Sequence, residues 1–80
     1  MTKVLMSRGE FIMYGERLKQ LRKERKVPQK QLGDLIGVGI RGYQHYESED
    51  TEPKIAMLIA LADFYDVSID YLVGRTDTPK

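Results

Sequence analysis

Residues 15–47 read GERLKQLRKERKVPQKQLGDLIGVGIRGYQHYE, and this run carries the strongest structural signal in the chain. It holds a basic amphipathic segment followed by two short amphipathic segments, which Gly37 separates. Apolar residues recur in it at the three- and four-residue spacing of a helix face. A residue without a Cβ readily adopts the left-handed backbone that ends a helix. The run therefore predicts three consecutive helices, the last two joined by a tight turn at Gly37.

Five helices are expected along the whole chain, and no strand pattern is visible in it. Pro28 suits the first turn of the second helix, and Ser68 can cap the last helix through its hydroxyl. Gly33 is expected to let the third helix cross closely, although a tolerated surface glycine is the alternative. The expected helices cover residues 14–25, 28–36, 39–47, a segment opened by Pro53, and residues 69–73. The positions expected to face the core are Leu32, Leu35 and Ile36 in the second helix, and Ile55, Leu58, Ile59, Leu61 and Ala62 in the fourth.

Size and composition exclude several classes of function. A chain of 80 residues forms one small domain with a modest core, which leaves little room for a catalytic cleft. It has no cysteine and one histidine, and it carries no visible nucleophile–base pair, metal-ligand cluster or glycine-rich phosphate loop. We therefore expect no enzyme activity, no cofactor and no metal. The longest apolar run, residues 55–62, is too short to span a bilayer, so a cytoplasmic protein is expected.

The charges are unevenly distributed, although the net charge is only +1. Residues 14–45 carry an excess of Lys and Arg, and residues 46–80 carry an excess of Asp and Glu. Such asymmetry favours a basic face toward a polyanion. The alternative is that the basic residues of the first helix merely form a solvated face; these are Arg17, Lys19, Arg22, Lys23, Arg25 and Lys26.

The third helix combines hydrogen-bonding side chains with aromatic ones on opposite sides. At about 100° per residue, one sector is formed by Ile40, Arg41, Gln44 and His45, and the other by Gly42, Tyr43 and Tyr46. Arginine can donate two bonds to guanine, glutamine can pair with adenine, and isoleucine can touch a thymine methyl. An exposed histidine without a ligand is the alternative for the last position. For the two tyrosines a core position is favoured over base stacking. The pattern is typical of a helix that reads the DNA major groove.

Five pieces of the chain, spread over residues 15–74, together resemble the helix-turn-helix family of the phage Cro and repressor proteins, the xenobiotic-response-element type. These pieces are GERLKQLRKER, PQKQLGDLIGV, the Tyr46–Glu47 pair, Pro53 and LADFYDVSIDYLVGR. The resemblance implies an all-α fold, a compact five-helix repressor-like helix-turn-helix domain that is usually dimeric. It implies that Gln29 contacts a phosphate and braces the recognition helix at 39–47. It further implies base contacts from Ile40, Arg41, Gln44 and His45, and an internal ion pair between Arg22 and Glu47.

The chain departs from that family pattern in three places. Glycines stand at positions 39 and 42, where the first replaces a hydroxyl cap and the second lowers helix propensity by roughly 1 kcal/mol. The loop at residues 48–52 holds three carboxylates, which would repel phosphate and leave Lys54 as the nearest cation. Pro28 replaces the usual hydroxyl cap of the second helix. Lys30, Lys54 and Gln29 are the expected phosphate contacts.

These features predict a sequence-specific regulator of transcription, repressor-like, that binds double-stranded operator DNA. The alternative is a degenerate helix-turn-helix domain that acts as a protein–protein adaptor or an antitoxin-type partner-binding module. We expect residues 1–13 to be an N-terminal extension, residues 14–74 the DNA-binding domain and residues 75–80 a C-terminal tail. A homodimer is expected to form mainly on DNA through the region of the last helix. The apolar residues there are Phe64, Tyr65, Tyr71, Leu72 and Val73, of which Tyr65 and Leu72 are expected to belong to the monomer core.

Overall fold

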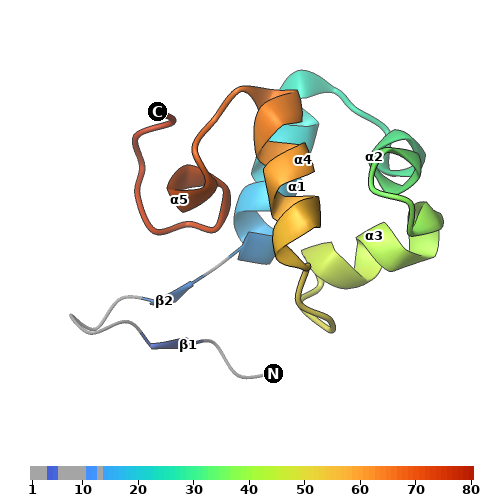
Figure 1. Cartoon of the computed structure of the whole chain (residues 1–80), viewed down its shortest axis with the longest axis horizontal. Coiled ribbons are helices and arrows are strands. Elements are labelled where there is room, and N and C mark those ends of the chain that lie inside the picture. Colours follow the sequence, from blue (N-terminus) through green and yellow to red (C-terminus); the bar gives the residue numbers. More distant parts are fainter. Residues whose placement is uncertain (1–3, 6–10, 13) are drawn as a thin grey trace.

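The computed structural model describes residues 4–5, 11–12 and 14–80. In Figure 1, α2 and α3 lie together on one side of α1 and α4, and α5 lies on the other side. Helices α2 and α3 pack against each other, α3 also contacts α1, and α5 contacts both α1 and α4. The expected all-α five-helix fold is confirmed. The helices are α1 (Tyr14–Arg25), α2 (Gln29–Leu35), α3 (Gly39–Glu47), α4 (Ile55–Tyr65) and α5 (Ile69–Leu72).

The helix ends follow the local signals in the sequence closely. The limits expected for α1 and α3 agree with the structure at both ends. Helix α2 is slightly shorter than expected, because Pro28 precedes it with an extended backbone and Ile36 follows it outside helical geometry. Ser68 caps α5 as expected: its hydroxyl accepts a hydrogen bond of 3.0 Å from the backbone N–H of Tyr71.

A pair of short strands was not expected. Strand β1 (Val4–Leu5) pairs in antiparallel fashion with β2 (Phe11–Ile12), and Val4 lies opposite Ile12. Each strand has only two residues, which is shorter than the stretch over which alternation of apolar and polar residues becomes visible. The expectation that the chain contains no strand is therefore wrong for this small part of it, and the fold class is unaffected.

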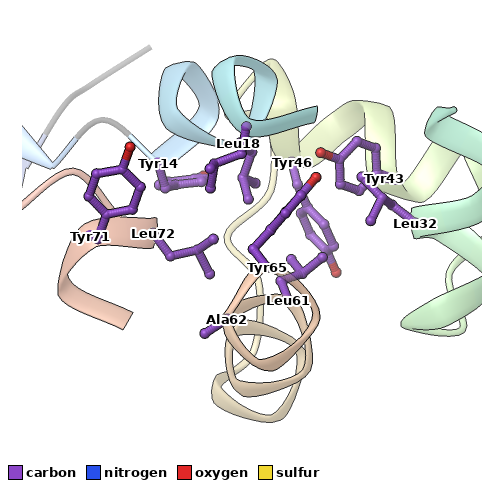
Figure 2. Close-up of a cluster of buried hydrophobic side chains, with 11 residues drawn as sticks. Tyr14, Leu18, Leu32, Tyr43, Tyr46, Leu61, Ala62, Tyr65, Tyr71 and Leu72 are labelled. Atoms are coloured by element: carbon purple, nitrogen blue, oxygen red, sulfur yellow. The ribbon is translucent and has the colours of Figure 1, made fainter. Parts of the chain in front are cut away.

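The core draws side chains from all five helices, as Figure 2 shows for most of its members. Tyr43 and Tyr46 lie in it, which confirms the core positions expected for them. The tail also contacts the helices, since the backbone N–H of Ser68 donates to the carbonyl of Pro79 at 2.7 Å. The buried apolar residues are Tyr14, Leu18, Leu21, Leu32, Tyr43, Tyr46, Leu61, Ala62, Tyr65, Tyr71 and Leu72.

Three apolar side chains that were expected to face the core are exposed instead. They are Leu35 at 45% exposure, Ile55 at 66% and Ile59 at 45%. In α4 the buried stripe runs along Leu61, Ala62 and Tyr65, and Ile55 lies in the first turn, beyond the reach of the core. Helical spacing therefore identified the inner face of α4, but it did not indicate how far along the helix the core extends.

Two glycines explain how closely α2 and α3 approach each other. A Cβ on Gly33 would collide with the backbone carbonyl of Gly39, so the expected close crossing is confirmed. Gly39 itself has a φ of +74°, a left-handed conformation that strains any residue with a side chain. This backbone gives a physical reason why glycine replaces the hydroxyl cap of the family pattern at position 39.

Candidate nucleic-acid interface

Helix α3 presents one exposed face, and the four side chains expected to contact bases all lie on it. Ile40 is 44% exposed, and Arg41, Gln44 and His45 are exposed as well. Tyr43, Tyr46 and Glu47 are buried on the opposite side of the helix. Within the described residues Arg41 makes no ion pair or side-chain hydrogen bond, so its guanidinium is available to a ligand.

A charged pair behind this face ties α3 to α1. Nε of Arg22 donates to one carboxylate oxygen of Glu47 at 2.6 Å, and Nη2 donates to the other at 3.2 Å. The Glu47 side chain is only 4% exposed and that of Arg22 is 17% exposed. The internal ion pair expected from the family resemblance is therefore present, and its fork geometry holds both side chains in place.

Two glutamines extend this pair to the surface. Nε2 of Gln29 donates to Oε1 of Glu47 at 3.2 Å. The other end of the same amide, Oε1 of Gln29, accepts a hydrogen bond from Nε2 of Gln44 at 2.9 Å. Gln29 therefore braces the exposed face of α3 from the first position of α2, as expected.

The ionisation of Glu47 reflects this arrangement. Burial alone would raise the pKa of its carboxyl group, but hydrogen bonds from Arg22 and Gln29, together with the nearby guanidinium charge and the neighbouring Tyr43 hydroxyl, hold the pKa below its usual value. The same carboxylate raises the pKa of Arg22. Glu47 is therefore a carboxylate at neutral pH in spite of its burial.

Two tyrosine hydroxyls end beside this pair in the core. The side chains of Tyr43 and Tyr65 point their hydroxyls toward the same buried region (Figure 2), and neither oxygen has a well-formed hydrogen bond within the described residues. Burial raises the pKa of Tyr65 to about 12 and raises that of Tyr43 further. Both phenols therefore stay neutral, and they surround the Arg22–Glu47 pair with a mainly apolar setting.

The acidic loop after α3 is largely occupied with internal contacts. Asp50 accepts a hydrogen bond of 2.8 Å from the Ser48 hydroxyl and lies 3.3 Å from Nδ1 of His45. These contacts lower the pKa of Asp50. Glu49 is buried, and its carboxylate accepts a hydrogen bond from the backbone N–H of Gly15. Two of the three loop carboxylates that were expected to repel phosphate thus have partners inside the domain.

The arginines of α1 are used mainly to hold the fold together. Nη1 of Arg17 donates to the carbonyl of Tyr71 at 2.6 Å, and its guanidinium lies 3.9 Å from the centre of the Tyr71 ring. Arg25 donates to the carbonyl of Tyr65 at 3.2 Å. Sequence reasoning missed both roles. Arg17, Arg22 and Arg25, the three arginines of α1, therefore all make contacts within the domain, although Arg25 is partly open to solvent. The lysines Lys19 and Lys23 of α1, and Lys26 just after it, are exposed.

The expected phosphate-contacting residues lie at or near helix starts. Lys30 is exposed on α2 and pairs with Asp34 one turn along the helix at 2.8 Å. Hydrogen bonding to Asp34 raises the pKa of Lys30. Lys54 is exposed immediately before α4, and Gln29 begins α2. Unlike Lys30, Lys54 makes no ion pair within the described residues, so it can bind a phosphate without first breaking one.

The described part of the chain offers little for other kinds of chemistry. Across residues 4–5, 11–12 and 14–80, no three His, Cys, Asp or Glu side chains gather in a way that could hold a metal ion. None of the helices seen there combines the length and the apolar character needed to cross a membrane. A shallow, open hollow at the start of α2 is lined by Pro28, Lys30, Gln31 and Asp34.

Comparisons with known proteins agree with this geometry. A family model described as "Helix-turn-helix" matches residues 18–72. An uncharacterized HTH-type transcriptional regulator of Bacillus subtilis, YobD, is 46% identical over 67 residues, which are 84% of this chain and 60% of that protein. The cryptic phage CTXphi transcriptional repressor RstR of Vibrio cholerae is 40% identical over 65 residues, 81% of this chain and 58% of the repressor. The chain thus spans about 60% of the length of these relatives.

Solved structures show the same arrangement of helices. A transcriptional regulator from Listeria innocua superposes with a TM-score of 0.76 at 38% identity, covering 79% of this chain and 59% of that one. The P22 c2 repressor in complex with a synthetic operator gives a TM-score of 0.73 at 34% identity, covering 80% of this chain and 97% of the repressor chain.

Proposed function

Because the chain belongs to the helix-turn-helix family, we propose that it binds double-stranded operator DNA in a sequence-specific way and regulates transcription as a repressor. The observation that carries this proposal is the exposed face of α3, where Ile40, Arg41, Gln44 and His45 stand together over a buried Arg22–Glu47 brace. A short helix with such a face fits the major groove. The likeness to a repressor whose structure includes an operator supports the same mode of docking.

The four exposed side chains would take different parts in base recognition. Arg41 has a free guanidinium and can donate two hydrogen bonds to O6 and N7 of guanine. Ile40 offers only apolar surface, which suits the methyl group of thymine. His45 can reach a base or a phosphate once its contact with Asp50 at 3.3 Å is released. Gln44 completes the face beside Gln29.

Phosphate contacts would come from Lys54, Lys30 and Gln29. Lys54 can approach the DNA backbone directly, because it is exposed at the start of α4. Lys30 must share its charge with Asp34, so a smaller gain is expected from it. Gln29 can contribute its backbone N–H while its side chain holds Gln44 and Glu47. With three arginines of α1 engaged internally, the proposed DNA affinity depends largely on lysines.

A homodimer on a palindromic site is part of the proposal. Among the apolar residues around α5, Tyr65 and Leu72 are buried in the monomer as expected, and Tyr71 is buried as well. This leaves Phe64 at 38% exposure and the partly exposed Val73 for a dimer contact. So small an apolar surface favours association mainly on DNA, where two half-sites hold the copies one helical turn apart. Sedimentation with a palindromic duplex should give two chains per duplex, and a strictly one-to-one complex would contradict the dimer.

A second candidate is supported by the outer side of α4. Ile55 and Ile59, one turn apart, are both exposed there, and exposed apolar groups of this kind are typical of a surface that binds another protein. An adaptor or antitoxin-type role would use this side rather than α3. The two roles differ in their ligand, so a DNA-binding measurement separates them.

The test is a selection of bound duplexes from a random pool, followed by titration of the selected site. Nanomolar binding to the selected duplex, tighter than to random duplex by a thousandfold or more, is expected of a specific regulator. Equal weak binding to both duplexes, or no binding at low salt, would overturn the proposal and leave the adaptor role. The proposed activity is binding alone, with no cofactor, at operator DNA in the cytoplasm.

A further inference from the structure

A chain of hydrogen bonds leads from the buried ion pair to the exposed face of α3. Glu47, at its buried end, determines which group of each amide donates and which accepts. Both carboxylate oxygens of Glu47 already accept hydrogen bonds from Arg22, at 2.6 and 3.2 Å. An ionised carboxylate can only accept hydrogen bonds. The side chain of Gln29 must therefore turn its NH2 group toward Glu47, which it does at 3.2 Å.

The orientation of Gln29 then determines that of Gln44. A carboxamide has its acceptor oxygen and its donor nitrogen on opposite sides, so Oε1 of Gln29 faces away from Glu47. That oxygen can only accept, and it receives a hydrogen bond from Nε2 of Gln44 at 2.9 Å. Gln44 thus uses one N–H inside the domain. Its carbonyl oxygen and its second N–H are left for a ligand on the exposed face.

We propose that this hydrogen-bond relay makes Gln44 select a base that presents an amino hydrogen, above all adenine. The relay consists of Arg22, Glu47, Gln29 and Gln44. Adenine offers an N6–H donor beside the N7 acceptor in the major groove, and these complement a carbonyl oxygen beside an N–H. Guanine offers acceptors at both N7 and O6, so one of them would face the carbonyl oxygen of Gln44. The inference rests on the proposed DNA binding and assigns specificity to residues that need not touch a base.

The buried pair sharpens this selection, because a glutamine that is free to turn can also present its NH2 group to an acceptor of guanine. If the amide of Gln44 could turn over freely, it could present either its oxygen or its NH2 group to the groove. In the second orientation it could donate to N7 or O6 of guanine, which weakens the preference for adenine. Glu47 removes that freedom as long as it is ionised, and its contacts with Arg22 and Gln29 favour the ionised form. Gln29 and Glu47 are therefore positioning residues for recognition.

The direct test substitutes Gln29, which leaves the ion pair intact. Duplexes that carry each of the four base pairs at the position read by Gln44 would be titrated with the wild-type chain, the position being identified by loss of preference in Gln44→Ala. The wild type should prefer adenine over guanine by about tenfold, as a well-formed side-chain contact allows. Gln29→Leu should bring the two affinities to within about twofold, because the amide of Gln44 then loses the acceptor that fixes its orientation. Gln31→Leu, an exposed glutamine on the same helix, is the matched control and should keep the full preference.

A second variant reverses the relay rather than breaking it. In Glu47→Gln the oxygen of the new amide would remain with Arg22, and its NH2 group would face Gln29. Both glutamines would then turn over, and Gln44 would present its NH2 group, so preference should move from adenine toward guanine. Thermal unfolding identifies any sample that has lost its fold, and the Gln29→Leu result stands without this variant.

The outcomes separate this inference from the proposed function. A wild-type preference for guanine or thymine at the Gln44 position overturns the relay, as does full adenine preference in Gln29→Leu. In both cases the domain still binds its site, so the proposed function stands. Failure of the wild type to bind any duplex overturns the proposed function and the relay together.

Discussion

The carboxylate of Glu49 accepts a hydrogen bond of 2.9 Å from the backbone N–H of Gly15, so the loop after α3 caps the first turn of α1. The contact is buried, and a Cβ on Gly15 would collide with the Glu49 side chain and with the carbonyl of Glu47. A negative charge at a helix N-terminus is also favoured by the helix dipole. An acidic residue that was expected from the sequence to repel phosphate is thus part of the fold.

Glu49→Ala should lower the free energy of unfolding by about 1–2 kcal/mol, because the first turn of α1 loses a charged cap. Urea unfolding at neutral pH measures the change. Glu52→Ala, in the same loop but exposed, provides the control and should change the stability by less than about 0.5 kcal/mol. Equal effects of the two substitutions would mean that the cap contributes nothing specific.

Breaking the Arg22–Glu47 pair should also reduce stability. Either Arg22→Ala or Glu47→Ala leaves one partly buried charge without its partner, which costs up to about 3–5 kcal/mol. The double substitution removes both charges, so its loss should be smaller than the sum of the single losses. A complete double-mutant cycle by thermal or urea unfolding tests this expectation, and strict additivity would show that the two side chains are not coupled.

Arg41→Ala should relax base preference more than it weakens general DNA binding. A guanidinium paired with guanine discriminates by about 1–3 kcal/mol at one base pair, whereas affinity for random duplex is shared among several cations. Titration of selected and random duplexes measures both quantities. Arg75→Ala, which removes an arginine paired with Asp70 outside α3, should change neither. Equal losses on the two duplexes in Arg41→Ala would argue against base contact.

Lys54→Ala should make DNA binding less sensitive to salt. Each phosphate neutralised contributes roughly 0.9 to the slope of log K against log salt concentration, so loss of one contact should reduce the slope by about that amount. Lys30→Ala should have a smaller effect because Asp34 shares its charge, and Gln29→Ala should leave the slope nearly unchanged. Lys80→Ala in the tail, away from α2 and α3 (Figure 1), is the control. Unchanged slopes for both Lys54 and Lys30 would exclude them as phosphate contacts.

The helices could be predicted from sequence because their signals are local. Leu18 and Leu21 mark the buried side of α1, Gly37 adopts a φ of +76° after α2, and Ser68 caps α5. The exposed face of α3 was predicted for the same reason, since one helical period places Arg41 and Gln44 together. The Arg22–Glu47 pair was predicted from the resemblance to a known family, and the structure contains this pair.

The contacts that were missed depend on chain segments far apart in sequence. Glu49 reaches Gly15 because its backbone has a φ of +64°. The pattern of residue types does not predict this backbone conformation. Arg17 binds the carbonyl of Tyr71, and a basic helix gives no sign of which arginines turn inward. The exposure of Ile55 likewise depends on where the core ends, which periodicity along one helix cannot indicate.

The tyrosines of the core make the stability of the fold depend on pH in alkaline solution. All five tyrosines are buried, and the chain has no tryptophan to mask their absorbance. In the unfolded chain these phenols ionise near pH 10, whereas burial raises the pKa of Tyr65 to about 12 and also raises that of Tyr43. These phenols therefore leave the free energy of unfolding unchanged below about pH 10 and lower it as the pH rises toward 12, because the unfolded chain gives up its phenolic protons more readily. In strong base, the ultraviolet absorbance of phenolate would thus report the unfolding of the domain.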